Sequence, residues 1–412
     1  MRILQINAFH YLRGGVERAY FDEARWLLGA GDEVAQFATQ DPRNLPSPTA
    51  QYFAPSADYG ASAPLGRQLD QLGRVIWSKP AAAALERLLD ARTFDVAHVH
   101  APSRYLTPSV LRVLERRGVP TVMTLHDFKP WCTNRVMFAQ GAPCERCRGG
   151  HHWHAMETRC VQDSRARSAV AAVEAYAHDW MHAYRSVRLW IAPSRFVAQK
   201  VREHGLSESR VRVVPHGMEL GEWRGASNAA GVGASNGAKG AVLFAGRLSP
   251  EKGVRLLPGL AMRIAPEPLL VAGDGPLRGW LESQCSALPN LHLLGHVTNT
   301  ELASQLGDAA VVIVPSLFYE TFCFAAAEAM AVERPVVASE LGAIPELIEH
   351  ERTGLLVPPD DVHGLAEAVT RARTDPAARA WAAAGRARLL ELCDPARHVE
   401  SLHAVYREAM SA

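Results

Sequence analysis

Short β-branched runs alternate with helical segments along the whole chain, and this alternation constrains the fold more than any other feature. The runs are apolar at nearly every position, which is typical of strands that are buried on both faces. Because parallel strands need a crossover between them, the pattern predicts parallel sheets covered by helices. The predicted strands are Arg2–Ala8, Glu33–Ala38, Asp95–His100, Thr121–His126, Leu189–Ala192, Val211–Pro215, Ala241–Ala245, Leu269–Ala272, Leu291–Val297, Val311–Val314 and Pro335–Ser339.

One stretch breaks the alternation and divides the chain. Residues 225–240 consist of Gly, Ala, Ser and Asn with one valine and one lysine, the composition of a flexible linker. A length of 412 residues suggests two to three domains. We therefore predict a first α/β domain at 1–218, a linker at 219–240 and a second α/β domain at 241–396. Further segments are predicted as a surface loop at 41–66, a turn at 354–359, and helices at 361–373, 376–392 and 397–410.

The overall composition restricts the class of protein. Apolar residues make up 48% of the chain, charged residues 21%, and the formal net charge is +1, which gives no electrostatic basis for binding nucleic acid. The first residues enter a strand pattern without the segments of a signal peptide. No apolar run approaches the ~18 residues that span a bilayer. We therefore expect a cytoplasmic protein with at most peripheral contact at the inner face of the membrane.

Two glutamates, Glu320 and Glu328, follow the strand Val311–Val314 across an apolar run that is typical of a helix. Glu320 is therefore expected at the carboxyl edge of the sheet, where ligands of doubly wound folds bind. A helix that starts near Thr321 would direct free backbone N–H groups toward an anionic group such as a diphosphate. Eight residues of helical rise separate the two carboxylates by ~12 Å, so they could hold opposite ends of one extended ligand.

Other strands also run into loops suited to phosphate or sugar. The first strand is followed by Gly14 and Gly15, and paired glycines let backbone amides approach a ligand. The first strand of the second domain leads into a loop with Arg247 and Lys252, two cations that can neutralise a diphosphate without a metal. His126 ends the fourth strand, where it is placed to contact a substrate.

Four of the seven cysteines gather directly after His126, with three histidines among them. They are Cys132, Cys144, Cys147 and Cys160. A C-x-x-C pair can offer two sulfurs to one tetrahedral ion, so we predict a structural zinc site in an insertion at 128–165. An iron–sulfur cluster uses the same number of thiolates and is an alternative, as are disulfides or free thiols.

The segment 168–188 places Val170, Val173, Ala177 and Trp180 at helical spacing, with arginines at both ends. This pattern has two interpretations. The helix could pack these side chains on the sheet, or they could form an interfacial face that meets a lipid-linked substrate.

Taken together and in order, these motifs resemble those of the family 4 retaining glycosyltransferases. The resemblance covers nearly the whole chain. It rests on Gly14-Gly15, His126-Asp127, Gly246-Arg247-x4-Lys252, Gly273-Asp274-Gly275-Pro276 and Glu320-x7-Glu328. It implies the GT-B fold, in which two Rossmann-like domains face each other across a cleft. The first domain would bind the acceptor and the second a nucleotide-diphosphate sugar, and a last helix at 397–412 would cross back to the first domain.

The resemblance also implies roles for individual residues. Arg247 and Lys252 would stabilise the charge on the leaving diphosphate, Glu320 and His126 would contact the sugar, and Glu328 would bind the ribose. Further donor contacts would come from Gly14, Gly15, Gly246, Gly273, Gly275, Thr321, Phe322 and Cys323. Cys323 stands where the family often has glycine. The chain contains no Asp-x-Asp, in keeping with a family that holds its donor without a catalytic metal.

The implied activity is sugar transfer from a UDP- or GDP-type donor to an acceptor hydroxyl with retention of configuration. The expected acceptor is a lipid-linked or growing surface polysaccharide. A small-molecule natural product is an alternative acceptor. A phosphorylase, an epimerase and a sugar-nucleotide binder without catalysis are alternative functions. A glycoside hydrolase fits poorly, because its two carboxylates lie ~5–10 Å apart.

Overall fold

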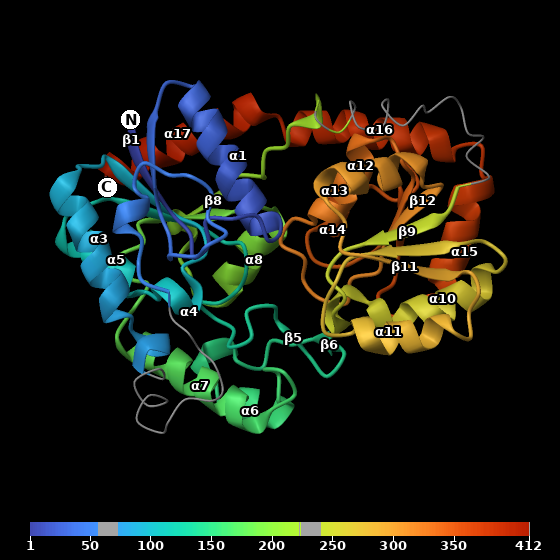
Figure 1. Ribbon diagram of the computed structural model, residues 1–412, viewed down its shortest axis with the longest axis horizontal. Coiled ribbons are helices and arrows are strands. Elements are labelled where there is room, and N and C mark those ends of the chain that lie inside the picture. Colours follow the sequence, from blue (N-terminus) through green and yellow to red (C-terminus); the bar gives the residue numbers. More distant parts are fainter. Residues whose placement is uncertain (57–72, 222, 224–239, 412) are drawn as a thin grey trace. The chain divides into compact units, whose positions relative to one another are not determined.

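The computed structural model describes residues 1–56, 73–221, 223 and 240–411 (Figure 1). It divides into two compact units. The first unit contains residues 1–139, 145–217 and 395–412, and the second contains residues 140–144 and 218–394. Most of the predicted linker and part of the predicted loop at 41–66 lie outside the described residues. Among the described helices, none is long and apolar enough to cross a membrane.

The first unit is built on a six-stranded parallel sheet with the order β2-β1-β3-β4-β7-β8. The order changes direction between β1 and β3, which makes a topological switch point at the carboxyl ends of these strands. The strands are β1 (Arg2–Ile6), β2 (Glu33–Phe37), β3 (Val96–Val99), β4 (Thr121–Thr124), β7 (Leu189–Ala192) and β8 (Val211–Val213), with the short β5 (Phe138–Ala139) in the insertion.

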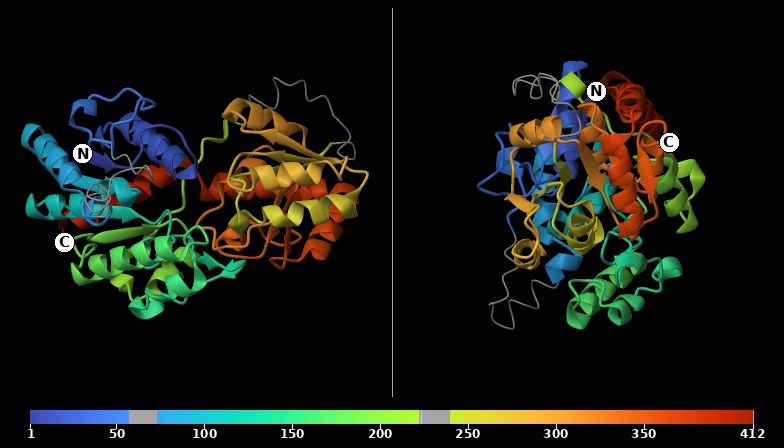
Figure 2. Two further views of the ribbon diagram at one scale, coloured as in Figure 1. Left: turned by 60° about the horizontal axis from the view of Figure 1, so that its bottom comes forward. Right: turned by 90° about the vertical axis from the view of Figure 1, so that its right-hand side faces the viewer.

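Helices cover both faces of this sheet (Figures 1 and 2). Helix α17, at the end of the chain, contacts α1, β3 and β4, while α3 and α5 pack together on the opposite face. The helices of the unit are α1 (Gly15–Gly29), α3 (Lys79–Ala91), α4 (Ser103–Leu106), α5 (Ser109–Arg116), α6 (His154–Thr158), α7 (Arg165–Trp180), α8 (Arg195–Glu203) and α17 (Pro395–Ser411), with 3₁₀ turns η1 (Ala50–Tyr52), η2 (Arg148–Gly150) and η3 (Glu208–Arg210).

The second unit is also built on a six-stranded parallel sheet, in the order β11-β10-β9-β12-β13-β14. Its switch point lies between β9 and β12. The strands are β9 (Val242–Ala245), β10 (Leu269–Ala272), β11 (Leu291–Gly295), β12 (Val311–Val314), β13 (Val336–Ser339) and β14 (Leu355–Val357); residues Ala142–Pro143 form the short β6. The helices are α10 (Leu257–Ile264), α11 (Arg278–Cys285), α12 (Asn299–Asp308), α13 (Phe324–Ala331), α14 (Ile344–Leu347), α15 (Val362–Thr374) and α16 (Ala378–Leu392), with η4 (Pro250–Lys252) and η5 (Val254–Leu256).

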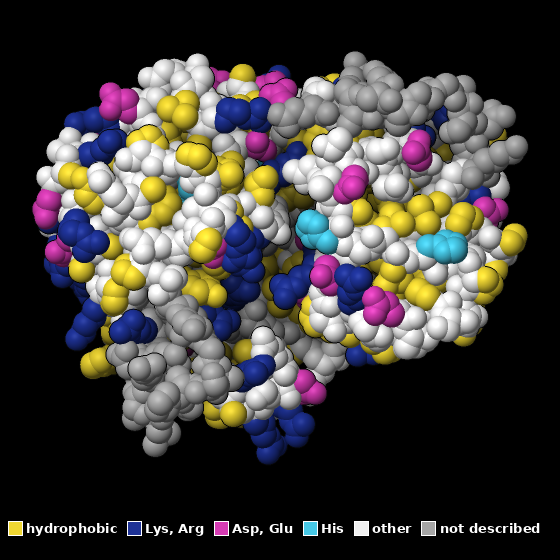
Figure 3. Space-filling view, viewed as in Figure 1, with side chains coloured by type: hydrophobic (Ala, Val, Ile, Leu, Met, Phe, Trp, Pro, Cys, Tyr) yellow, Lys and Arg dark blue, Asp and Glu magenta, His cyan; other side chains and the backbone are white. Residues whose placement is uncertain are grey.

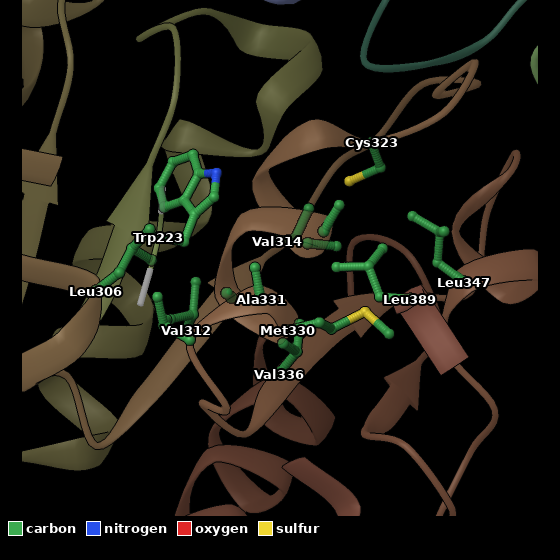
Figure 4. Close-up of a cluster of buried hydrophobic side chains, with 14 of the residues drawn as sticks. Trp223, Leu306, Val312, Val314, Cys323, Met330, Ala331, Val336, Leu347 and Leu389 are labelled. Carbon is green, nitrogen blue, oxygen red and sulfur yellow. The ribbon is translucent and has the colours of Figure 1, made fainter. Parts of the chain in front are cut away.

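Continuous apolar runs serve both faces of this second sheet, because successive side chains point in opposite directions. In β12, Val311 and Ile313 join the core under α10 and α15, while Val312 and Val314 join the core under α12, α13 and α16. Figure 4 shows the core under α12, α13 and α16, in which Met330 and Leu389 lie close to the strand side chains. The predicted α/β class with two doubly wound sheets is therefore confirmed.

Three sequence predictions are corrected. The segment 354–359, predicted as a turn, contains strand β14, whose three residues are too few to show a periodic pattern. The helix expected from Thr321 begins only at Phe324. The packing interpretation of α7 is wrong for its larger apolar side chains: Val170, Val173 and Trp180 are exposed, and the helix buries Ala171 and Ala172 instead.

Candidate active site

The candidate site in the second unit is built where the sheet order changes direction. Strands β9 and β12 are neighbours, and the loops that follow them therefore leave the same edge of the sheet side by side. The backbone N–H of Leu317 donates to the carbonyl of Glu251 over 2.8 Å, which ties the two loops together. The site is thus anchored by main-chain contacts as well as by side chains.

Lys252 and Glu320 meet across these two loops. The Lys252 Nζ atom lies 2.7 Å from Glu320 Oε1, and the Ser316 hydroxyl donates to the same oxygen over 2.7 Å. Glu320 is buried, with 6% of its surface exposed. Burial opposes the positive charge on Lys252, but the Glu320 carboxylate outweighs this effect and raises the pKa of Lys252. The lysine therefore remains a cation at neutral pH and is held in place by a buried carboxylate.

Glycines allow the loops of this edge to approach one another closely. A Cβ atom on Gly253 would lie 1.9 Å from the Pro315 carbonyl oxygen, and one on Gly273 would lie 1.9 Å from the Gly246 carbonyl oxygen. Both residues have positive φ angles, 72° and 139°. Gly275 makes a similar approach, because a Cβ there would lie 2.5 Å from the Leu248 carbonyl oxygen. These glycines bring the loops after β9, β10 and β12 into contact.

Helix α13 begins later than predicted because the backbone conformation at Cys323 is not that of a right-handed helix. Cys323 is the residue before the helix and has φ 77°, in the left-handed region that favours glycine. Its side chain is buried, and burial raises the pKa of the thiol, so it is uncharged at neutral pH. A glycine in this position would relieve backbone strain, which gives a physical reason for the glycine that the resemblance leads one to expect.

The remaining predicted donor residues of the second unit follow strands β9 and β12 in the chain. Arg247 follows β9 directly and is exposed, and it forms no ion pair with any other residue that the structure describes. Thr321 and Phe322 lie in the loop before α13, and Glu328 lies within α13 itself. The pairing of Lys252 with Glu320 leaves Arg247 as the cation on this loop that has no carboxylate partner within the described chain.

The first unit presents a second set of candidate residues at the carboxyl edge of its own sheet. Gly14 precedes α1, has an extended backbone with φ 178°, and a Cβ built there would meet nothing within 4 Å. Gly15 is the first residue of α1, so its N–H belongs to the unpaired group at the helix start. This open loop provides room for a ligand without strain in the backbone.

His126 follows β4 and is surrounded by other histidines. Its Nε2 atom lies 3.0 Å from His100 Nδ1, and its ring stacks on that of His216 with centroids 5.1 Å apart. Burial lowers the pKa of His126 to about 4, so the ring is neutral at pH 7. A neutral imidazole can donate or accept a hydrogen bond to a sugar hydroxyl without adding charge.

The four clustered cysteines are free thiols in the structure. Cys132 is buried, which raises its pKa to about 12, and its sulfur lies 3.0 Å from Asn134 Oδ1. Among the described residues, no three of these sulfurs lie within 4.8 Å of one another. The zinc and iron–sulfur assignments therefore stay predictions.

Two residues of the second-unit site were not singled out from the sequence. The Ser316 hydroxyl donates a hydrogen bond to the Glu320 carboxylate. Gly342 has φ 64°, and a Cβ atom on this residue would lie 2.6 Å from the Glu320 backbone nitrogen. The N–H of Ala343 donates to the Glu320 carbonyl. Gly342 could have been selected as a site residue from the sequence, because it begins a Gly-Ala-Ile-Pro-Glu segment after a predicted strand.

Comparison with known families agrees with this architecture. A profile described as "Glycosyltransferase Family 4" matches residues 13–222, and one described as "Glycosyl transferases group 1" matches residues 239–375. The first match alone spans just over half of the chain. The chain belongs to glycosyltransferase family 4. The predicted family 4 resemblance is thereby confirmed.

Individual family 4 relatives match parts of the chain. The glycogen synthase of Mycobacterium tuberculosis is 35% identical over 181 residues, which are 42% of this chain and 42% of the relative. This chain therefore matches less than half of that relative's length. The alpha-maltose-1-phosphate synthase of Mycolicibacterium smegmatis is 28% identical over 352 residues, which are 79% of this chain and 82% of the relative.

Solved structures show the same fold over the full chain. A sucrose-phosphate synthase from Thermosynechococcus elongatus superposes with a TM-score of 0.69 at 21% identity, covering 100% of this chain and 99% of its own. The Anabaena protein HepE, solved with UDP-glucose, has a TM-score of 0.69 at 18% identity, covering 99% and 100%. At these identities the likeness concerns the fold alone, which is the GT-B fold of these glycosyltransferases.

Proposed function

We propose that this protein transfers a sugar from a nucleotide-diphosphate sugar to an acceptor hydroxyl and retains the configuration of the sugar. The observation that carries the proposal is the pair of Lys252 and Glu320 at the switch point of the second sheet, with exposed Arg247 on the same loop. Two cations suit a diphosphate, and a buried carboxylate suits the hydroxyls of a sugar. The three side chains come from loops at one edge of the sheet.

The proposed reaction breaks the bond between the anomeric carbon and a phosphate oxygen of the donor. The acceptor oxygen forms its bond to that carbon on the same face of the sugar, and the acceptor proton moves to the leaving phosphate oxygen. Negative charge therefore grows on the diphosphate as the reaction proceeds. Fixed cations at Lys252 and Arg247 act on this charge in the transition state, where they contribute most to the rate. Glu328 is assigned to the ribose and His126 to the sugar.

A thermal-shift panel of UDP-, GDP-, ADP- and dTDP-sugars tests the proposal. Donor at ~100 times its Kd should stabilise the protein by about 2.7 kcal/mol. UDP-glucose and GDP-mannose come first, because HepE was solved with UDP-glucose and a Corynebacterium glutamicum relative is named for GDP-mannose. The expected result is a shift with one nucleotide class that Arg247→Ala removes.

The control for this panel is Arg255→Ala, which removes an exposed cation that stacks on Trp280 instead. It should leave the donor shift intact. The absence of a shift with every nucleotide sugar would contradict the proposal. A shift without transfer to any alcohol, accompanied by turnover with inorganic phosphate, would instead favour a phosphorylase.

For the acceptor we propose a lipid-linked glycan presented at a membrane, because the first unit carries an exposed apolar patch. The patch consists of six side chains on and beside α6 and α7, helices that pack against each other. Its members are Trp153, Met156, Val170, Val173, Tyr176 and Trp180. Trp180 is 84% exposed. Four of them recur on one face of α7, as in helices that lie in a membrane interface.

Charge near this patch favours an anionic lipid surface. Arg165 and Arg167 are exposed at the start of α7, and Figure 3 shows Lys and Arg side chains in dark blue at the edge of the molecule over α6. Tryptophan and tyrosine prefer the headgroup level of a bilayer, where arginine can pair with phosphate. The combination fits a surface of anionic phospholipid.

Vesicle flotation tests the membrane proposal. The protein should float with vesicles containing phosphatidylglycerol and much less with pure phosphatidylcholine, and Trp180→Ser should reduce the bound fraction by about fivefold or more, because the most exposed aromatic anchor is lost. Met262→Ser, an exposed apolar side chain of the second unit, is the matched control. Equal binding of the Trp180 and Met262 variants would refute the assignment of the patch.

A further inference from the structure

The core of the first unit contains a carboxylate enclosed by histidines. Glu23 projects from α1, and its side chain is 2% exposed. His98 lies in β3 and His100 directly after it, and both rings are fully buried. Because residues two apart on a strand point to the same face, both histidines face the helix that carries Glu23. This cluster is distinct from the donor loops of the second unit and from the cysteines of the insertion.

One potential ligand atom of each of the three side chains lies close to the other two. Glu23 Oε2 lies 3.5 Å from His98 Nδ1 and 3.6 Å from His100 Nε2, and all three atoms lie within 4.8 Å of one another. Bonds of about 2.0–2.1 Å in a tetrahedral zinc site separate neighbouring ligand atoms by about 3.3–3.5 Å. The two oxygen–nitrogen distances, 3.5 Å and 3.6 Å, are close to this ligand separation. One glutamate and two histidines are also a ligand set that zinc uses.

Two of the three atoms form no hydrogen bond within the described chain. Glu23 Oε2 and His100 Nε2 are buried without a hydrogen-bond partner among the described residues. Buried polar atoms are nearly always paired, so each such atom needs an explanation. A cation between the carboxylate oxygen and the imidazole nitrogens would satisfy both.

The outer nitrogens of the two histidines are already oriented. His98 Nε2 lies 2.7 Å from the Thr124 hydroxyl, and His100 Nδ1 lies 3.0 Å from His126 Nε2. Metal-binding histidines characteristically use the second nitrogen in this way, which fixes the tautomer and the ring. The His98 Nδ1 atom also contacts the Tyr406 hydroxyl at 2.7 Å, a hydrogen bond that metal binding would replace.

The other oxygen of Glu23 faces a further histidine, His398. His398 Nδ1 lies 2.7 Å from the Pro215 carbonyl and must donate to it, because a carbonyl only accepts. The His398 Nε2 atom lies 3.2 Å from Glu23 Oε1. His398 therefore lies on the Oε1 side of the carboxylate, whereas His98 and His100 lie on the Oε2 side.

We propose that Glu23, His98 and His100 form a structural binding site for a divalent transition metal of the zinc class. The metal would join α1 to β3 inside the first unit, beneath the edge that carries the Gly14–Gly15 loop and His126. The site adds to the proposed function without depending on it, because its ligands contact none of the donor loops.

Cobalt substitution tests this site, since Co²⁺ replaces zinc and absorbs visible light when it is bound. The full chain is produced in cobalt-supplemented medium, because the buried ligands favour metal uptake during folding. A Cys132→Ser/Cys144→Ser/Cys147→Ser/Cys160→Ser background removes the four clustered thiolates, so cobalt that stays bound without a sulfur signal must use nitrogen and oxygen. We expect visible d–d bands, no sulfur-to-cobalt charge-transfer band, and about one cobalt per chain by elemental analysis.

The same background carries the decisive variants. Glu23→Gln keeps the shape of the side chain and should lower cobalt content at least tenfold, because it removes the charged ligand. Glu17→Gln, on the same helix, is the matched control and should retain the metal. The His100→Cys variant provides a gain-of-signal test that does not depend on loss of folding, because a new thiolate ligand should add the charge-transfer band. Colourless protein in the parent background, or bands that survive Glu23→Gln, would overturn the proposal and leave a purely hydrogen-bonded cluster.

Discussion

Gly273→Ala is expected to lower the stability of the second unit by about 3–5 kcal/mol, in the range of severe core substitutions. The new Cβ would lie 1.9 Å from the Gly246 carbonyl oxygen, and the backbone at φ 139° is one that side chains rarely adopt. Neither atom sits on a flexible side chain, so relief requires the loops after β9 and β10 to separate. Chemical denaturation, monitored by a spectroscopic signal of the second unit, measures the decrease in its free energy of unfolding.

Gly279→Ala is the matched control for this prediction. Gly279 lies in α11, is exposed, and has open space at its Cβ position. Alanine there should stabilise the helix by up to about 1 kcal/mol. Similar losses in both variants would mean that the loop contact at Gly246 is unimportant. A variant of Gly273 that folds normally would contradict the close approach itself.

Lys252→Ala should lower kcat by at least ~10²-fold, the scale seen when one group that stabilises developing charge is removed. The expected reason is loss of the cation that lies 2.7 Å from Glu320 and faces the proposed diphosphate. Steady-state kinetics with the donor from the thermal-shift panel provide the measurement. Arg255→Ala, three residues along, should retain activity within about twofold.

Stability must be separated from catalysis in this experiment. Removing Lys252 leaves the buried Glu320 carboxylate without its cation, and breaking such a pair can cost about 3–5 kcal/mol. The double variant Lys252→Met/Glu320→Gln removes both charges and should recover much of the stability while activity stays low. Near-normal turnover of either Lys252 variant would exclude the proposed role.

The sequence predicted the sheets well because buried parallel strands have a strong local signal. Each predicted strand has a counterpart in the structure, usually shorter by one or two residues at its ends. Strand β14 was missed because three residues between Gly354 and Pro358 are too few for a pattern, and its pairing partner β13 defines it. Long-range pairing of this kind has no local signature.

The site was predictable in composition but not in geometry. Arg247, Lys252 and Glu320 were selected from their positions after strands, but the direct pairing of Lys252 with Glu320 depends on β9 and β12 being neighbours. The start of α13 was misplaced because Cys323 adopts a positive φ that its residue type does not predict. The histidine cluster around Glu23 was not predicted because α1, β3 and α17 meet only in the folded unit.

The packing of α17 has a consequence for how the protein is made. Leu402, Val405 and Tyr406 of this helix complete the core of the first unit together with Ile3 of β1 and Val122 of β4. The ribosome must therefore release the entire second unit before the first can finish its core. Domains usually mature from the amino end during translation. Here the sheet of the second unit can assemble before α17, the last helix of the first unit, has been synthesised. A nascent chain halted near residue 394 should therefore expose the apolar surface that α17 covers.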